Sequence, residues 1–306
     1  YLWKEDYAAC AELCTQIISS GQFSLLPVNR EEAEALDEMG EPTLVYYAND
    51  GDISDLFNKI YYRGNSVESI FELQFGEDKN NPFVGWFRPV LGVLQANTSN
   101  INAEYFPSSS IDRRWSDIRP EVSFKQSGGT VWKWIGTSQQ GTEYRDINAS
   151  FCNWIFYRLA DIILMKAEAL TQQAIAESNN QEKLQEAAGL LRQIRTRANA
   201  PESTDLLYKQ DETNINARTL EEFILNERAR EFLFEGKRWF DVLRHVKRDN
   251  FRNKEYLLRL AVLSVSPEKI SIVQEKWSNY PGSLYMPIYF EELNVNKNLV
   301  QNEFYK

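Results

Sequence analysis

The second half of the chain carries apolar residues at helical spacing. In the segment 151–173 they recur at every third or fourth position, and the segment 182–200 repeats this spacing until Pro201. Alanine recurs on both apolar faces, which permits two helices to pack closely. These features predict an antiparallel helical hairpin of the tetratricopeptide type. The insertion SNNQ between the two runs breaks the strict repeat period, so we expect a degenerate repeat.

A third long run with helical spacing covers residues 219–245. Thr219 is its expected N-cap, and a glutamate three residues later completes a capping box. Gly236 falls on the apolar face, where close approach of another backbone would have to offset its cost of about 1 kcal/mol in a helix. The segment 1–19 is also helical in pattern, and a short helix is expected at 266–277, before an irregular tail.

The middle of the chain lacks helical periodicity and is rich in Gly, Pro, Asn and Tyr. Short strand-like runs appear in it, such as PTLVYYA and SIFELQF. The stretch SFKQSGGTVWKWIG is expected to form a β-hairpin with Gly128 and Gly129 at its turn. Trp132 and Trp134 would share one face of its second strand. We interpret this pair as core residues, because the opposite face is also largely apolar.

Together these patterns predict a mainly α fold. We expect tetratricopeptide-like helical hairpins and an irregular loop-rich region that contains a few short strands. The loop-rich region covers 22–150, and the helical region with its C-terminal tail covers 151–306. We expect both to belong to one domain over residues 1–306.

Composition and charge exclude several classes of function. The formal charge of −10 argues against nucleic acid, which requires clustered Lys and Arg. His245 is the single histidine, and three cysteines are too few for a disulfide framework or a zinc site. No phosphate-binding or dinucleotide-binding motif appears, so no metal and no cofactor is expected. No run of 18 apolar residues is present to cross a membrane.

The run 219–245 also carries the best catalytic candidates. A stripe of acidic and basic side chains follows it at helical spacing: Glu227, Glu231, Glu235, Arg238 and Asp241. Two carboxylates one turn apart could serve as a general acid and base. The alternative is that neighbouring basic residues pair with them and fix the packing of helices: Arg228, Arg230, Lys237, Arg238 and Arg244. We favour the pairing, and we expect that the protein is not an enzyme and has no catalytic residues.

Aromatic residues in the loop-rich region are the stronger candidates for a site. The chain has eight Trp and is 13% aromatic, and several rings stand in Gly-, Pro- and Asn-rich stretches. A sugar ring can lie with its C–H face on an aromatic ring while polar side chains bind its hydroxyls, and loops commonly carry such sites. Trp86 is the first candidate, because Gly85 gives the backbone room to shape a loop. The full set of candidates is Trp86, Phe87, Arg88, Asn81, Tyr61, Tyr62 and Trp115. Any single ring among them could instead fill the core.

Two separate groups of motifs resemble a known family. The stretches AEAL and LRQIRTRANAP precede NERAREFLFEGKRWFDVLRH, and the tail contains LYMPI and EELNVNKNLVQN. In this order they resemble the SusD/RagB family of outer-membrane nutrient-binding lipoproteins of Bacteroidetes. The tail departs from the family pattern at Tyr289, where a proline is usual, and at Val295-Asn296-Lys297, which replaces Asn-Pro. The residues that carry the resemblance lie in 157–306.

The resemblance implies a function and a location. It implies capture of an oligosaccharide at the cell surface and its transfer to a SusC-like TonB-dependent transporter. It also implies a lipid anchor at the extracellular face of the outer membrane. The anchoring cysteine would precede this chain, as would further N-terminal helices, so Cys10 and Cys14 are not expected to be the anchor. A peptide ligand, or a helical interaction scaffold without a small ligand, remains an alternative.

Overall fold

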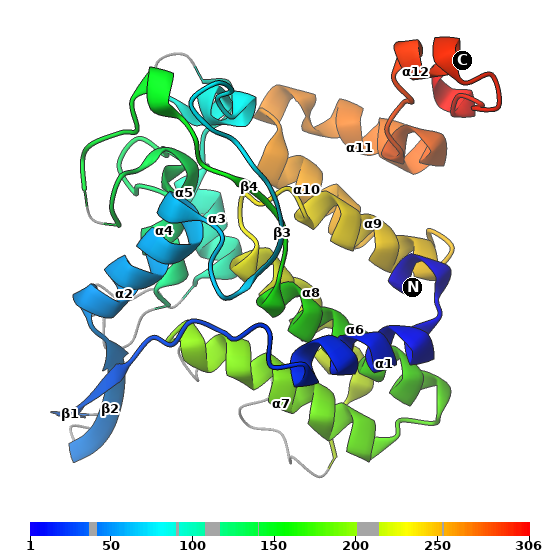
Figure 1. Ribbon diagram of the computed structural model, residues 1–306. Coiled ribbons are helices and arrows are strands. Elements are labelled where there is room, and N and C mark those ends of the chain that lie inside the picture. The colour runs from blue at the N-terminus through cyan, green and yellow to red at the C-terminus, as the bar shows by residue number, and fades with distance from the viewer. Residues whose placement is uncertain (37–41, 90–91, 108–116, 140, 201–213, 253) are drawn as a thin grey trace. The chain divides into compact units, whose positions relative to one another are not determined.

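The computed structural model describes residues 1–36, 42–89, 92–107, 117–139, 141–200, 214–252 and 254–306 (Figure 1). The chain divides into two compact units, 1–237 and 238–306. Within the described residues, none of the helices combines the length and the apolar character needed to span a lipid bilayer.

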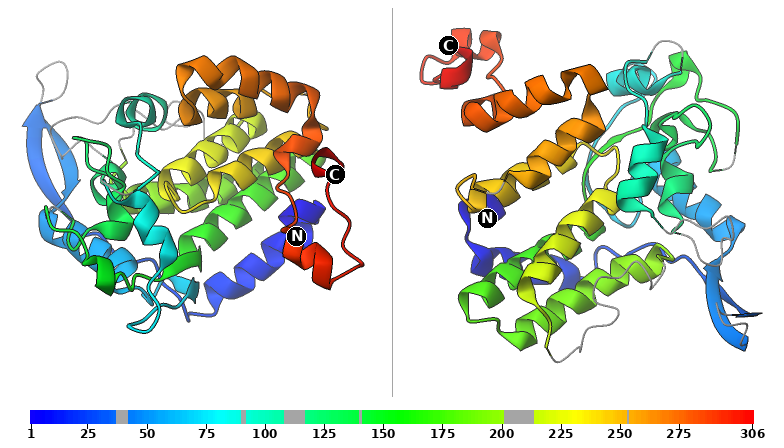
Figure 2. Two further views of the ribbon diagram at one scale, coloured as in Figure 1. Left: turned by 90° about the horizontal axis from the view of Figure 1, so that it is seen from above. Right: turned by 180° about the vertical axis from the view of Figure 1, so that it is seen from behind.

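A block of four helices forms one half of the first unit. The helices are α1 (Tyr7–Ser19), α6 (Leu159–Ala176), α7 (Gln181–Arg197) and α8 (Ala217–Glu231). The central helix α6 packs against the other three, and α1, α6 and α7 lie side by side in each view (Figure 2). Fully buried alanines on α6 and α7 let these backbones approach closely. The predicted hairpin is confirmed, but the expected start of its first helix at 151 is wrong, because Trp154–Arg158 pairs as a strand and the helix begins at Leu159.

A second hydrophobic core lies among the short elements of the loop-rich region. It is built around Phe57, Phe124, Trp132 and Trp134, all of which are buried. The elements around it are α2 (Asp50–Phe57), a π-helical turn (Asn58–Arg63), a 3-10 helix (Pro82–Phe87), α3 (Thr98–Tyr105), α4 (Arg119–Ser123) and α5 (Trp132–Ile135). This region therefore contains more helix than the sequence predicted. The mainly α fold class itself is confirmed.

Two antiparallel ribbons account for the strands in the described residues. Strand β1 (Arg30–Leu36) pairs with β2 (Pro42–Ala48), and β3 (Ser69–Leu73) pairs with β4 (Trp154–Arg158). The second ribbon is irregular, with register shifts on either side of Phe71. It joins segments that lie far apart in the sequence, and β4 runs directly into α6.

The predicted β-hairpin at 123–136 is only partly correct. Gly128 and Gly129 do form a turn with positive φ, and the Lys125 amide donates to the Thr130 carbonyl. Beyond Val131, however, the chain forms α5 instead of a strand. All four residues of α5 are buried, and the Gly136 amide closes the helical turn by donating to the Trp132 carbonyl at 2.8 Å. The interpretation of Trp132 and Trp134 as core residues is confirmed.

The predicted continuous helix over 219–245 is wrong. Helix α8 ends at Glu231, and its N-cap is Asn216, whose side chain accepts from the Thr219 amide. Phe234 and Gly236 then have positive φ values of 63° and 77°. A Cβ on Gly236 would meet only the Trp154 ring, at 3.7 Å, which is an ordinary contact. The glycine is needed for its left-handed backbone and not for close helix packing.

The second unit contains short helices and an irregular tail. Helix α9 (Arg238–Arg248) is followed by α10 (Glu255–Ser264), α11 (Ile270–Asn279) and α12 (Phe290–Val295). Amide side chains hold the tail: Gln301 exchanges two hydrogen bonds of 2.9 Å with the backbone of Ile288, and Asn302 donates to the Gly282 carbonyl. Gln301 and Asn302 of the NLVQN stretch therefore hold the backbone of the tail in place.

Candidate functional site

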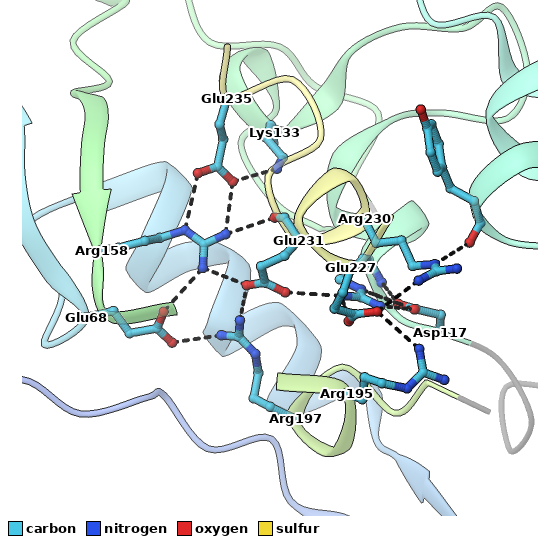
Figure 3. A network of polar contacts seen from close by, with 12 residues as sticks. Glu68, Asp117, Lys133, Arg158, Arg195, Arg197, Glu227, Arg230, Glu231 and Glu235 are labelled. Carbon is cyan, nitrogen blue, oxygen red and sulfur yellow. Dashed lines mark hydrogen bonds and ion pairs between the residues drawn. The ribbon is translucent and has the colours of Figure 1, made fainter. Parts of the chain in front are cut away.

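Three carboxylates of the charged stripe, Glu227 and Glu231 on α8 and Glu235 in the turn after it, lie inside the first unit in a network of buried ion pairs (Figure 3). Glu231 is near its centre and accepts from Arg158 at 2.7 Å, from Arg119 at 3.3 Å and from Arg197. The other buried members are Glu68, Asp117, Lys133, Arg195, Glu227, Arg230 and Glu235. They come from α4, α5, α7, α8, β4 and the loops that precede α4 and β3. Glu235 comes from the turn after α8. The network therefore ties the helical block to the loop-rich region.

Two further carboxylates of this network, Glu227 and Glu235, each bind more than one basic side chain. Glu227 accepts from Arg119 at 2.6 Å, from Arg230 at 3.0 Å and from Arg195 at 3.1 Å. Glu235 lies 3.1 Å from a guanidinium nitrogen of Arg158 and 3.1 Å from the ammonium of Lys133. The interpretation of these carboxylates as ion-paired is confirmed, but of the neighbouring basic residues named for them only Arg230 is a partner in these described ion pairs, through Glu227. Most partners of these carboxylates belong to other elements and not to the same helix.

The electrostatics of these carboxylates are unsuited to proton transfer near neutral pH. Burial alone would raise the pKa of Glu227, but Arg119, Arg195 and Arg230 outweigh it and lower that pKa to about 2. In the same way Arg197, Arg158 and Arg119 overcome burial and hold the pKa of Glu231 far below its usual range. Such carboxylates stay ionised and make poor general acids. Their role is to hold arginines in place.

Three other basic residues named with the stripe, Arg228, Lys237 and Arg244, also form ion pairs. Arg228 and Lys237 both bind Asp161 of α6, at 2.8 and 2.5 Å. Arg244 pairs with Asp241 one turn away, at 2.9 Å, within the second unit. These contacts confirm the structural interpretation of these charges as well.

The cysteines and the histidine lie in packing environments. All three cysteines are free and buried, and the His245 ring packs edge-on against Tyr256 with centroids 5.0 Å apart. No cluster of three or more His, Cys, Asp or Glu side chains that could hold a metal ion occurs in the described part of the chain.

Trp86 is the most exposed of the described aromatic candidates, at 49%. It lies on the 3-10 helix Pro82–Phe87, and its carbonyl accepts from the amides of Val93 and Leu94, both at 3.0 Å. Its ring meets Phe83 in an edge-to-face contact with centroids 5.1 Å apart. A half-exposed indole on a hydrogen-bonded backbone is suited to act as a stacking surface.

Three of the other candidates are buried. Phe87 is 5% exposed and belongs to the second core, and Tyr61 packs against Phe57 and Trp134. The Asn81 side chain donates to the Cys152 carbonyl at 2.8 Å and caps the 3-10 helix. These three side chains shape the surface from beneath and offer no exposed face to a ligand.

Arg88 and Tyr62 lie at the border of the surface. Arg88 donates to the Arg145 carbonyl at 2.6 Å and to the Ser150 hydroxyl at 3.0 Å. Tyr62 is partly exposed, and the guanidinium of Arg145 lies 4.4 Å from the centre of its ring. Arg88 and Arg145 thus hold the 144–150 loop against the 3-10 helix and the π-helical turn. The last candidate, Trp115, lies outside the described residues.

Gly92, which no sequence pattern singled out, shapes the loop beside Trp86. A Cβ on Gly92 would lie 2.2 Å from the Arg88 carbonyl oxygen and 2.5 Å from that of Trp86. Only glycine permits this close approach. Around Gly85, by contrast, a Cβ would meet nothing within 4 Å. The expectation that Gly85 makes room for the loop is therefore wrong, because the crowded backbone is at Gly92.

Comparisons with known proteins identify the family. The sequence profile of the SusD family matches residues 54–305, which is most of the chain. This chain belongs to the SusD family. The SusD-like protein P38 of Formosa agariphila is 28% identical over 277 residues, which cover 80% of this chain and 49% of that protein. The chain therefore spans about half the length of this relative.

Solved structures of the SusD superfamily share the fold. One from Bacteroides vulgatus has a TM-score of 0.60 at 18% identity and is matched by 99% of this chain over 60% of its own length. A SusD homolog from Bacteroides thetaiotaomicron has a TM-score of 0.57 at 19% identity, with 100% of this chain matched over 57% of that one.

The SusD motif NERAREFLFEGK is explained by the network and the turn after it. Its three buried glutamates bind arginines and a lysine of four other elements, and its glycine supplies the positive φ. Arg158 and Asp161, which interrupt an apolar run in the sequence, are the signal that could have revealed such buried partners. The motif therefore marks the scaffold of this SusD family chain.

Proposed function

We propose that this protein binds a nutrient oligosaccharide at a surface centred on Trp86. The observation that carries the proposal is the half-exposed indole on a backbone held by two hydrogen bonds. An aromatic face matches the apolar C–H face of a sugar ring, and neighbouring polar groups can bind its hydroxyls. Exposed Asn80, which precedes the N-cap residue Asn81 of the 3-10 helix, is one such polar neighbour.

The contacts around the indole favour an uncharged ligand. Arg88 and Arg145, two basic side chains of this region, both donate to backbone carbonyls. They are therefore engaged in holding the loops, and they are poorly placed to neutralise an anionic ligand. The formal charge of −10 adds to this preference, because it repels anionic polymers.

The role we infer is capture without catalysis. SusD family membership supports nutrient binding, and the buried glutamates described above serve as structural ion pairs. Each sugar contact would be modest, so that capture depends on closeness to a transporter. By the same family likeness we propose a SusC-like TonB-dependent transporter as partner. We also propose a location at the extracellular face of the outer membrane, through a lipid anchor.

A peptide ligand is the second candidate. The acidic charge of the chain would favour basic peptides over neutral ones. Such a ligand would be bound chiefly by charge, whereas a sugar would be bound chiefly by stacking on Trp86.

The proposal is tested by affinity electrophoresis in gels that contain neutral polysaccharides. Retardation of the wild type by at least one glycan, and its loss in Trp86→Ala, are expected. Trp3→Ala is the matched control, because Trp3 is also exposed, at 40%, and lies in the N-terminal segment. Equal retardation of the wild type and Trp86→Ala would refute the site, and no retardation by any glycan would refute the ligand class.

A further inference from the structure

The Trp86 ring is the outermost member of a row of aromatic rings that leads into the core. Phe83 lies 5.1 Å from Trp86 and 4.9 Å from Trp154, measured between ring centroids. Trp154 in turn stacks on Trp134, with centroids 4.7 Å apart and an angle of 22° between the planes. Trp134 is buried, and its indole N–H donates to the Phe234 carbonyl at 2.9 Å. The row thus joins an exposed ring to a fixed one.

Phe83 occupies the critical place in this row because of local geometry. It stands three residues before Trp86 on a 3-10 helix, in which side chains at that spacing lie one above the other. The helix start is fixed, since the Phe83 amide donates to the capping side chain of Asn81 at 2.9 Å. The rings of Phe83 and Trp86 meet at an angle of 63°, an arrangement that aromatic pairs prefer.

We propose that Phe83 is a positioning residue that fixes the plane of the Trp86 indole for ligand stacking. This inference rests on the proposed function. A ring held in one orientation loses little side-chain entropy when a ligand binds, whereas a mobile ring must be ordered at that moment. A fixed, flat surface suits a rigid sugar ring better than a flexible peptide side chain. Phe83 therefore favours the glycan over the peptide.

The experiment compares Phe83→Leu with a matched control. Leucine keeps an apolar side chain at position 83 but removes the ring between Trp86 and Trp154. Phe71→Leu removes a ring from another stacked pair, since Phe71 lies 5.3 Å from Phe156 on the β3–β4 ribbon. Phe83→Tyr keeps the ring and serves as the rescue variant. Circular dichroism and thermal unfolding establish that each variant is folded.

Two readouts separate positioning from binding. Proteins labelled with 5-fluorotryptophan give a ¹⁹F resonance for Trp86, assigned through Trp86→Phe, that reports on the ring without any ligand. Calorimetry with a neutral glycan that retards the wild type gives the affinity. Phe83→Leu is expected to shift or broaden the Trp86 resonance and to weaken binding about three- to tenfold. Phe71→Leu and Phe83→Tyr are expected to leave both close to wild type.

The possible failures are distinguishable. If Phe83→Leu leaves both the Trp86 resonance and the affinity unchanged while Trp86→Ala abolishes binding, the positioning role is refuted and the proposed function stands. If the wild type binds no glycan, the proposed function fails, and with it any role of Phe83 in sugar binding. An equal loss of affinity in Phe71→Leu would also overturn the inference, because it would show a general effect of ring removal.

Discussion

At the scale of single residues, Glu231 shows how this fold carries charge in its interior. Its carboxylate is buried, yet Arg119, Arg158 and Arg197 surround it and keep it ionised. A buried ion pair contributes modest net stability, but removing one partner leaves the others uncompensated. The sequence showed that Glu231 is charged and lies four residues from Glu227 and from Glu235, the spacing of one helical turn. It could not show the arginines, because two of them come from the distant α4 and β4.

Replacement of Glu231 by glutamine should therefore be costly. We expect Glu231→Gln to lower the free energy of unfolding by about 3 kcal/mol, because it leaves buried guanidinium groups unpaired. Glu222→Gln is the control, since Glu222 is exposed on the same helix, and its effect should stay within about 0.5 kcal/mol. Urea unfolding of the three proteins measures both differences. Equal effects of the two substitutions would contradict the described network.

Two glycines should respond to alanine with opposite signs. Gly236 has a φ of 77°, so Gly236→Ala should destabilise by about 1–2 kcal/mol through backbone strain. Gly189 lies in α7 with open space around it, so Gly189→Ala should stabilise by about 0.5–1 kcal/mol. Thermal unfolding of both variants is the measurement. A neutral or stabilising Gly236→Ala would show that the turn after α8 is not left-handed.

At the scale of elements, the ion-pair network joins helices to a β ribbon and makes the packing sensitive to acid. Arg119 of α4 and Arg158 of β4 both contact Glu231 of α8. These ion pairs link elements that are distant in the sequence, and they require ionised carboxylates. Helical periodicity predicted the existence of α6 and α7, because their apolar faces are continuous, but it missed β4 directly before α6. It failed at the turn after α8, because the left-handed backbone of Phe234 and Gly236 interrupts a run that otherwise keeps its spacing.

Stability should fall as the pH is lowered through the range in which Glu227 titrates. Its pKa is about 2 in the folded protein against an ordinary value of 4.5, so unfolding takes up a proton below that ordinary value. The stabilisation from this group, about 3 kcal/mol, is present above pH 4.5 and is lost as the pH falls toward 2. Urea unfolding at a series of acidic pH values should show a shallower pH dependence for Glu227→Gln than for Glu222→Gln. If the free energy of unfolding depended on pH equally in both variants, the lowered pKa of Glu227 would be contradicted.

At the scale of the whole molecule, the two halves of the first unit differ in how far the sequence predicts them. The helical block follows from apolar spacing, whereas the loop-rich region depends on contacts that the sequence does not show. Phe87 and Trp86 are neighbours in a similar setting, yet one is buried and the other half exposed. Composition could identify an aromatic-rich region as a candidate site. It could not decide which rings face outward, because that depends on how the 3-10 helix Pro82–Phe87 packs on the second core.

The acidic charge of the molecule gives a prediction about its ligand. A neutral glycan that stacks on Trp86 should bind with an affinity that changes less than about twofold between low salt and roughly 0.5 M salt, since stacking is not screened. Binding of a basic peptide to a chain of net charge −10 would weaken steeply over the same range. Titrations at several salt concentrations distinguish the two. Steep salt dependence would favour the peptide ligand.

The most direct test of the central proposal is a calorimetric titration of the wild type, Trp86→Ala and Trp3→Ala with a neutral oligosaccharide. We expect Trp86→Ala to lower the affinity at least about tenfold, because it removes the exposed ring at the centre of the surface. Trp3→Ala should match the wild type, although it also removes an exposed indole. Undiminished binding by Trp86→Ala would contradict the proposal that this ring is where the protein holds its ligand.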